Sequence, residues 1–294
     1  MSKQLRADML LLLVTFIWGS TFVLIKNAIA DIPPYTFILI RHLTAFILLS
    51  MVFIKRYRNF NKEVFVYSII IAVFLFAGYA LQTIGLIYTT ASNSSFITSL
   101  AVVFVPIISF LLFKRIPTRS TLLGIPIAIL GLALLTLNES LSINVGDFYT
   151  FICAISFGVS IILIERFTKK VDSVLMAMLQ ILFIAIISCV FSLTLENGMY
   201  SAINFSPDVI IAILITGILA TGLAFVIQNT VQRYTTAAHT ALIFTAEPIF
   251  GAMFAYLMHD EVFTLRHILG AGLIIAGVIL AECKFNKGEN NLSL

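Results

Sequence analysis

The chain has 294 residues, of which 60% are hydrophobic and only 11% are charged, and its formal net charge is +4. Its mean hydropathy of +1.07 excludes a water-soluble domain, because no soluble core of this length could bury so much apolar surface. The composition therefore predicts an all-α membrane protein with the lipid bilayer as its surroundings, and it implies no nucleic-acid partner.

Ten segments are long and apolar enough to cross a bilayer, since a helical span needs about 20 such residues. In chain order they are 7–29, 35–54, 64–87, 91–113, 119–137, 147–167, 172–195, 208–231, 235–258 and 264–283. The first segment follows Lys3 and Arg6, as the apolar part of a signal peptide would. Its apolar run is too long for a cleaved leader, so we expect it to remain as a span.

The two halves of the chain repeat each other. The run Tyr-Thr-Thr-Ala at 88–91 returns 146 residues later at 234–237, and Asp8 returns 139 residues later as Asp147. Because five spans carry the chain across the bilayer, the second copy must begin on the opposite side, as in the inverted repeats of secondary transporters. We predict two inverted-topology five-helix repeats around a central cavity. We expect residues 1–138 to form the first five-helix repeat and residues 139–294 to form the second, with a short cytoplasmic tail.

Basic residues are distributed unevenly between the predicted loops. With the N-terminus inside, the inner segments contain 15 of the 18 basic residues, whereas the outer segments contain only Lys26 and Arg266. Because Lys and Arg accumulate in short cytoplasmic loops, this predicts a multi-pass protein of the inner or plasma membrane with both termini in the cytoplasm. No loop exceeds roughly a dozen residues, and the Walker A, HExxH and GxSxG motifs are absent. We therefore expect no enzyme activity, no cofactor and no metal.

Polar side chains follow one face of the ninth predicted span, where Thr236, His239 and Glu247 recur at helical spacing. The fourth span, which is its repeat partner, carries a similar set near the opposite surface: Ser95, Thr98 and Ser99. Two polar half-pathways that meet near the midplane are what alternating access requires. We therefore predict that both sets contribute to substrate binding.

Two charged side chains are expected within the membrane. Glu247 lies about 18 Å along its span, where insertion of an acid costs about 2.5–3.5 kcal/mol, and Pro248 opens the helix beside it. Glu247 either binds a substrate or proton, or it is protonated and bonds the freed backbone. Arg41 lies nearer the outer boundary, so its guanidinium either snorkels to the interface or binds a substrate carboxylate. His239 is open to the same choice between helix packing and function.

Four further side chains are candidates for the cavity wall. Gln82 and Gln228 occupy equivalent positions in the two halves, which predicts either bonds between helices or substrate contacts. Trp18 falls near the middle of its span instead of in the interfacial belt. It is either a packing ring or an aromatic cavity wall, and the same alternatives apply to Tyr79.

These motifs, in this order, resemble the EamA branch of the drug/metabolite transporter superfamily. They are the run Phe-Ile-Trp-Gly-Ser-Thr-Phe at 16–22, the two Tyr-Thr-Thr-Ala runs, Glu247-Pro248 and the spacing from Gly270 to Gly277. The resemblance covers nearly the whole chain and implies a cavity lined mainly by spans one, three, four, six, eight and nine. One departure is that Ala101 stands at the position equivalent to Glu247, so the two repeats are not chemically equal.

Members of this family with known roles mostly export amino acids and other small metabolites. The leading hypothesis is therefore a secondary transporter that exports such solutes by alternating access, with protons as the candidate coupling ion and a monomer as the favoured state. One alternative is a non-transporting receptor or scaffold with the same fold. Another is an exchanger of phosphorylated metabolites, for which a single interior arginine is a poor phosphate clamp.

Overall fold

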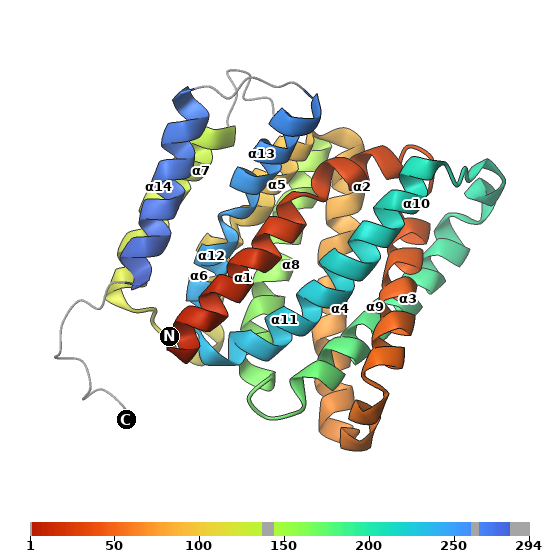
Figure 1. The fold of residues 1–294 in the computed structure, drawn as a ribbon, viewed down its shortest axis with the longest axis horizontal. Coiled ribbons are helices and arrows are strands. Elements are labelled where there is room, and N and C mark those ends of the chain that lie inside the picture. Colours follow the sequence, from red (N-terminus) through yellow and green to blue (C-terminus); the bar gives the residue numbers. More distant parts are fainter. Residues whose placement is uncertain (1, 137–143, 260–264, 283–294) are drawn as a thin grey trace.

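The computed structural model describes residues 2–136, 144–259 and 265–282, and its regular structure in these ranges is entirely helical (Figure 1). The first half contains α1 (Lys3–Gly19), α2 (Phe22–Ala28), α3 (Pro34–Val52), the 3-10 helix η1 (Ile54–Asn59), α4 (Lys62–Tyr88), α5 (Ala91–Ser99), α6 (Ala101–Phe113) and α7 (Arg119–Thr136). The second half contains α8 (Val145–Phe167), α9 (Ser173–Leu195), η2 (Asn197–Ala202), α10 (Pro207–Leu214), η3 (Ile215–Leu223), α11 (Ala224–Val231), η4 (Gln232–Tyr234), α12 (Ala237–Phe244), α13 (Glu247–His259) and α14 (Leu265–Glu282).

These helices form the predicted set of ten spans. Eight stretches of the described residues are long and apolar enough to cross a membrane, and two shorter apolar helices at 119–134 and 268–281 complete the set. The all-α membrane fold is thus confirmed. The predicted boundary between residues 138 and 139 lies outside the described residues, as does the predicted cytoplasmic tail.

Three spans are interrupted, and this corrects the single helical face expected for the ninth span. Span one changes direction between α1 and α2, span four is interrupted at Leu100, and span nine is interrupted between Phe244 and Glu247. In span nine, the Thr245 hydroxyl donates to the carbonyl of Leu242 at 2.6 Å, and Pro248 has no N–H to donate to the preceding turn. Glu247 therefore begins a new helix and does not continue the face that carries His239.

The interruptions in spans four and nine occupy the same position in the two repeats. The second segment of span four begins at Ala101 and that of span nine begins at Glu247, 146 residues later. Threonines also cap the first segments alike, because Thr90 accepts from the backbone N–H of Asn93 and Thr236 accepts from that of His239. The sequence repeat is therefore also a repeat of local structure.

Helices α7 and α14 run side by side at one edge of the molecule (Figure 1) and pack through glycines. A Cβ atom placed on Gly131 would lie 2.6 Å from the carbonyl oxygen of Gly270, and one placed on Gly277 would lie 2.7 Å from that of Gly124. Only glycine permits such close backbone contact. Gly131 meets Gly270, and their repeat equivalents, Gly277 and Gly124, meet in the same way. This reciprocal pattern is expected for two helices of inverted repeats.

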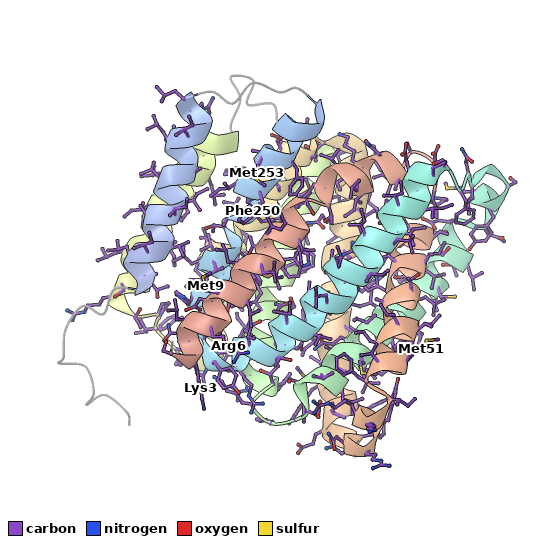
Figure 2. The ribbon with its side chains drawn as sticks, in the orientation of Figure 1. Lys3, Arg6, Met9, Met51, Phe250 and Met253 are labelled. Carbon is purple, nitrogen blue, oxygen red and sulfur yellow. The ribbon has the colours of Figure 1, made fainter. Side chains whose placement is uncertain are left out.

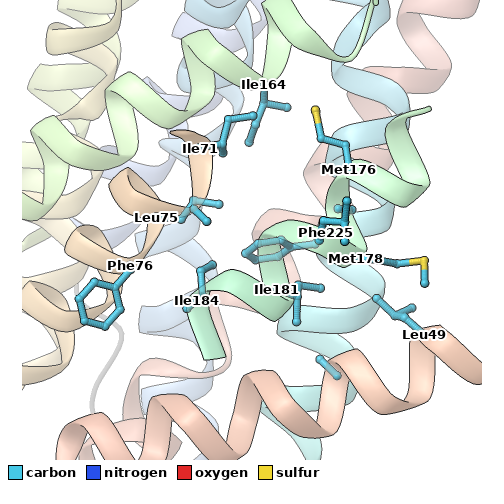
Figure 3. Packing of buried hydrophobic residues seen from close by; sticks show 14 of the residues in the cluster. Leu49, Ile71, Leu75, Phe76, Ile164, Met176, Met178, Ile181, Ile184 and Phe225 are labelled. Atoms are coloured by element: carbon cyan, nitrogen blue, oxygen red, sulfur yellow. The ribbon is translucent and has the colours of Figure 1, made fainter. Parts of the chain in front are cut away.

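The two repeats share one core. The largest cluster of buried apolar residues joins α3 and α4 of the first half to α8, α9 and α11 of the second. Figure 3 shows part of this cluster, in which Ile71 of α4, Ile164 of α8, Ile181 of α9 and Phe225 of α11 gather in one region. Helix α1 in turn packs against α13, where the rings of Phe16 and Phe250 meet edge to face. Figure 2 labels Phe250 on α13, beside α1. The halves therefore interlock instead of forming separate bundles.

Carboxylates fix both ends of the α3–α9 pair. At one end, the buried Glu196 accepts hydrogen bonds from the backbone N–H groups of Tyr35 and Thr36 at 2.7 and 2.8 Å, which caps α3. At the other end, Asp172 caps α9 and also accepts from Arg56 and Asn59, which follow α3. This pair therefore forms a fixed support beside the cavity.

Candidate central binding cavity

A central cavity with about 750 Å³ of empty space, its opening included, lies between the two repeats. Spans one, three, four, six, eight and nine line it, as the family resemblance implied, and α3 adds Arg41. Eight of the eleven predicted binding residues belong to its wall: Trp18, Arg41, Tyr79, Gln82, Thr98, Ser99, Gln228 and Glu247.

The other three predicted residues do not belong to this wall and make other contacts. Ser95 donates to the carbonyl of Ser92 within α5. Thr236 is exposed and caps α12, so it precedes the helix to which it was assigned. His239 is buried, and its Nε2 lies 3.4 Å from Oδ1 of Asp8 on α1. Because span nine is interrupted, only Glu247 of its predicted polar face reaches the cavity.

Arg41 does not snorkel to the interface, and that interpretation was wrong. Its side chain is only 3% exposed, its Nε donates to Oγ1 of Thr221 at 2.7 Å, and its guanidinium lies 4.9 Å from the centre of the Tyr79 ring. Among the described residues, no carboxylate forms an ion pair with it. A guanidinium has five N–H donors, so most of them remain available to an anionic group in the cavity.

A π-helical stretch of span eight positions both Arg41 and Trp18. Thr221, which bonds Arg41, and Ala220, whose carbonyl accepts from the Trp18 indole at 2.8 Å, both lie in η3. Wide turns of this kind displace backbone groups from the regular α-helical ladder and are frequent at functional sites. Neither Ala220 nor Thr221 was among the predicted site residues. The available signal was the Thr-Gly pair at 216–217 that returns at 221–222, five residues later.

Glu247 faces the cavity from the first turn of α13. Its side chain is 8% exposed, and among the described residues its carboxyl neither accepts nor donates a hydrogen bond, so the bond to a freed backbone carbonyl that the structural alternative requires is not seen there. Helix α1 approaches closely here, because a Cβ atom placed on Gly19 would lie 2.6 Å from the carbonyl oxygen of Glu247. The positive end of the α13 dipole also favours an anion at this position.

The two glutamines lie on the cavity wall and bond to neighbouring side chains. Gln82 of α4 donates to the Thr98 hydroxyl of α5 at 3.1 Å. Gln228 donates to Gln232, which in turn donates to the carbonyl of Ile161 on α8. The predicted helix-to-helix bond is thus observed for Gln82, whereas the bond of Gln228 stays within span eight. Substrate contact by either amide remains a prediction.

Aromatic rings form much of the remaining wall. Trp18 meets Phe244 edge to face at 5.0 Å between ring centres, and Tyr79 meets Phe157 in the same manner at 5.1 Å. The cavity thus combines one guanidinium, one carboxyl, two amides and several aromatic faces. Such a wall can hold a small solute that carries both charges and an apolar group.

Comparison with known proteins identifies the family. The model of the EamA-like transporter family matches the chain at residues 5–137 and again at 144–282. An uncharacterized transporter of Archaeoglobus fulgidus is 34% identical, with 96% of this chain and 87% of that protein covered. The uncharacterized transporter YoaV of Bacillus subtilis is 27% identical, with 93% and 96% covered. A crystal structure with 15% identity has a TM-score of 0.77 over 94% of this chain and 96% of its own, so it shares the fold. The chain belongs to the EamA-like transporter family.

Proposed function

We propose that this transporter is a secondary exporter of amino acids or related small zwitterionic metabolites, and that it works by alternating access. The observation that carries the proposal is the presence of two buried ionisable side chains of opposite type, the guanidinium of Arg41 and the carboxyl of Glu247, on the wall of one cavity. Neither has a charged partner among the described residues. Because buried charges are costly without partners, a ligand that supplies both counter-charges would be favoured.

The proposed binding mode assigns a role to each part of the wall. The guanidinium of Arg41 binds the substrate carboxylate, for which its planar donors are well suited. Glu247 binds the substrate ammonium, and Trp18 and Phe244 pack against the substrate side chain. A proton that binds Glu247 in the absence of substrate would compete with the ammonium, which would couple export to proton entry.

The inverted repeats support the transport mechanism. Broken helices recur in secondary transporters with alternating access, and spans four and nine are both broken at equivalent positions of the repeat. We further propose that both termini are cytoplasmic in the cell membrane. The uneven distribution of basic residues supports this orientation, and Lys3 and Arg6 lie together at the end of α1 where the chain begins (Figure 2).

A counterflow experiment in proteoliposomes tests the substrate class. A panel of radiolabelled amino acids is offered together with unlabelled competitors: the parent amino acid, its N-acetyl derivative and its carboxamide. We expect the zwitterion to compete, whereas the derivatives, which lack either the ammonium or the carboxylate, compete at least about tenfold less well. Equal competition by all three would refute the zwitterion site. If a folded protein moves no solute of any class, a receptor or scaffold becomes the better explanation.

A further inference from the structure

Two threonine linkers, one before each broken span, have nearly the same backbone conformation. Thr89 precedes α5 with φ −125° and ψ 174°, and Thr235 precedes α12 with φ −135° and ψ 173°. Each linker is assigned one of two aspartates that are equivalent in the repeat. Asp147 of α8 is assigned to the Thr89 linker, and Asp8 of α1 is assigned to the Thr235 linker. We call Thr89, Asp147 and Lys26 the Thr89 clamp, and Thr235, Asp8 and Glu165 the Thr235 clamp.

The Thr89 clamp is fully bonded. The hydroxyl of Thr89 donates to Oδ1 of Asp147 at 2.6 Å, and the ammonium of Lys26 donates to the Thr89 carbonyl at 2.6 Å. The backbones are also in close contact, since a Cβ atom placed on Gly146 would lie 2.9 Å from the backbone nitrogen of Thr89. Spans one, four and six are thereby held together at this face of the molecule.

The Thr235 clamp is only half bonded. Glu165, the repeat equivalent of Lys26, accepts from the backbone N–H of Ala237 at 3.1 Å. Asp8 and Thr235 are 9% and 7% exposed, and Nε2 of His239 lies 3.4 Å from Oδ1 of Asp8. Neither carboxylate oxygen of Asp8 nor the hydroxyl of Thr235, however, has a hydrogen-bond partner in the described part of the chain. A buried carboxylate without hydrogen bonds is costly. This end of the molecule therefore lacks the bond that its repeat equivalent makes.

We propose that the Asp147–Thr89 and Asp8–Thr235 hydrogen bonds are alternate gate contacts, one formed in each of the two end states of transport. The inference rests on the proposed alternating access, in which inverted repeats exchange conformations so that contacts at one face reappear at the other. The present structure is the state with the Thr89 clamp closed. The interruptions at Leu100 and Thr245 allow α5 and α12 to move without their partner segments. In the other state, the Thr235 hydroxyl donates to Asp8 while the Thr89 hydroxyl leaves Asp147.

Valine substitutions at the two threonines test the proposal, because they remove the same hydroxyl from opposite states. Thr89→Val weakens the present state, and Thr235→Val weakens the other. In a cysteine-free background, Ser99→Cys on the cavity wall serves as the reporter. Its labelling by a membrane-impermeant thiol reagent is followed from each side, in right-side-out and inside-out vesicles, without substrate.

The two variants should shift labelling in opposite directions. From the face that holds Thr89, we expect labelling to become about fivefold faster in Thr89→Val and slower in Thr235→Val, as the loss of one hydrogen bond predicts. The reverse should hold from the other face. Thr89→Ser and Thr235→Ser keep the hydroxyl and should restore the parent rates, which a purely structural role of the methyl group would not produce.

A shift in the same direction in both variants, or no shift in either, would overturn the proposal. If a valine variant does not fold, Asp147→Asn and Asp8→Asn provide a second pair, with the same opposite shifts expected. Because labelling needs no substrate, this result is independent of the counterflow experiment. Opposite shifts without amino-acid flux would retain the gate contacts and reject the proposed substrate.

Discussion

The two broken spans share a position in the repeat but differ in chemistry. Span four brings the hydroxyls of Thr98 and Ser99 to the cavity, followed by Ala101. Span nine brings Phe244 at the position equivalent to Thr98, and it has Glu247 where span four has Ala101. The first repeat thus supplies a neutral polar wall, and the second supplies an aromatic wall with one acid. Under the proposed function, the similar backbones of the two spans allow the exchange between states, whereas their different side chains bind the substrate.

Replacement of Glu247 by alanine gives span nine the residue that span four has at the equivalent position. This change should have the largest effect on transport. In Glu247→Ala we expect amino-acid counterflow to fall by about 100-fold, because the substrate ammonium loses a charged partner. Competition experiments should also show that the N-acetyl derivative is no longer at a disadvantage to the parent amino acid. Glu63→Gln, which changes an exposed acid of α4, is the control and should leave counterflow unchanged.

The milder Glu247→Gln separates substrate binding from proton binding. An amide can still accept a hydrogen bond from an ammonium but cannot exchange a proton, so we expect reduced counterflow that no longer depends on a pH gradient. Counterflow with an unchanged pH dependence would contradict the proposed proton role while leaving the ammonium site in place.

A second substitution gives the first repeat the residue that the second repeat has at the equivalent position. Gln180 is the equivalent of Arg41 and is fully buried in a reciprocal amide pair with Asn229. Arg41→Gln should lower counterflow by about 10- to 100-fold through loss of the carboxylate contact, and the carboxamide derivative should then compete as well as the zwitterion. Arg58→Gln, at an exposed position of η1, is the matched control. A uniform loss for all competitors would point to a structural role of Arg41.

Two glycines at equivalent positions of the two repeats also differ in their surroundings, and the expected effect of replacing them is smaller. A Cβ atom on Gly19 would clash with the backbone of Glu247, whereas one on Gly158 would lie 3.5 Å or more from its neighbours. Gly19→Ala should therefore lower stability by about 1–3 kcal/mol through overpacking, while Gly158→Ala should be close to neutral. Thermal unfolding of the purified variants in detergent measures the difference. Equal effects would contradict the close approach of α1 to α13.

The smallest effect is expected outside the cavity, at Asp172. Burial alone would raise the pKa of this carboxyl, but hydrogen bonds from Leu175, Asn59 and Arg56 outweigh burial and lower it below the ordinary value of 3.8. Its stabilising effect is therefore present above about pH 4 and is lost as the pH falls through the lowered pKa. Asp172→Asn should cost less than about 1 kcal/mol at neutral pH, because Arg56 is exposed and screened. Substrate selectivity should not change.

Much of this arrangement was predictable because it depends on patterns that repeat along the chain. Hydropathy located the ten spans, and the doubled motifs gave their inverted relation. Residues that are energetically unfavourable or unusual in the middle of a span, such as Trp18 and Glu247, identified most of the cavity wall. Such a side chain needs water or a hydrogen-bond partner within the membrane.

The remainder depends on rotation and local geometry that spacing does not reveal. The depth of Arg41 along its helix did not show that it turns inward to Thr221. Short hydroxyl bonds, such as that of Thr245 to Leu242, interrupt a helix without a strong sequence signal. The approach of Asp8 to His239 joins the first and ninth spans, and only the assembled fold brings them together.

The fluorescence of Trp18, the single tryptophan of the chain, tests the central claim most directly because its ring lies on the cavity wall. Titration of the purified protein with leucine or phenylalanine should change this fluorescence saturably. The N-acetyl and carboxamide derivatives should require at least about tenfold higher concentrations, and Glu247→Ala should abolish the preference over the N-acetyl form. No saturable change with any amino acid, or equal titration by all three forms, would contradict a zwitterion site between Arg41 and Glu247.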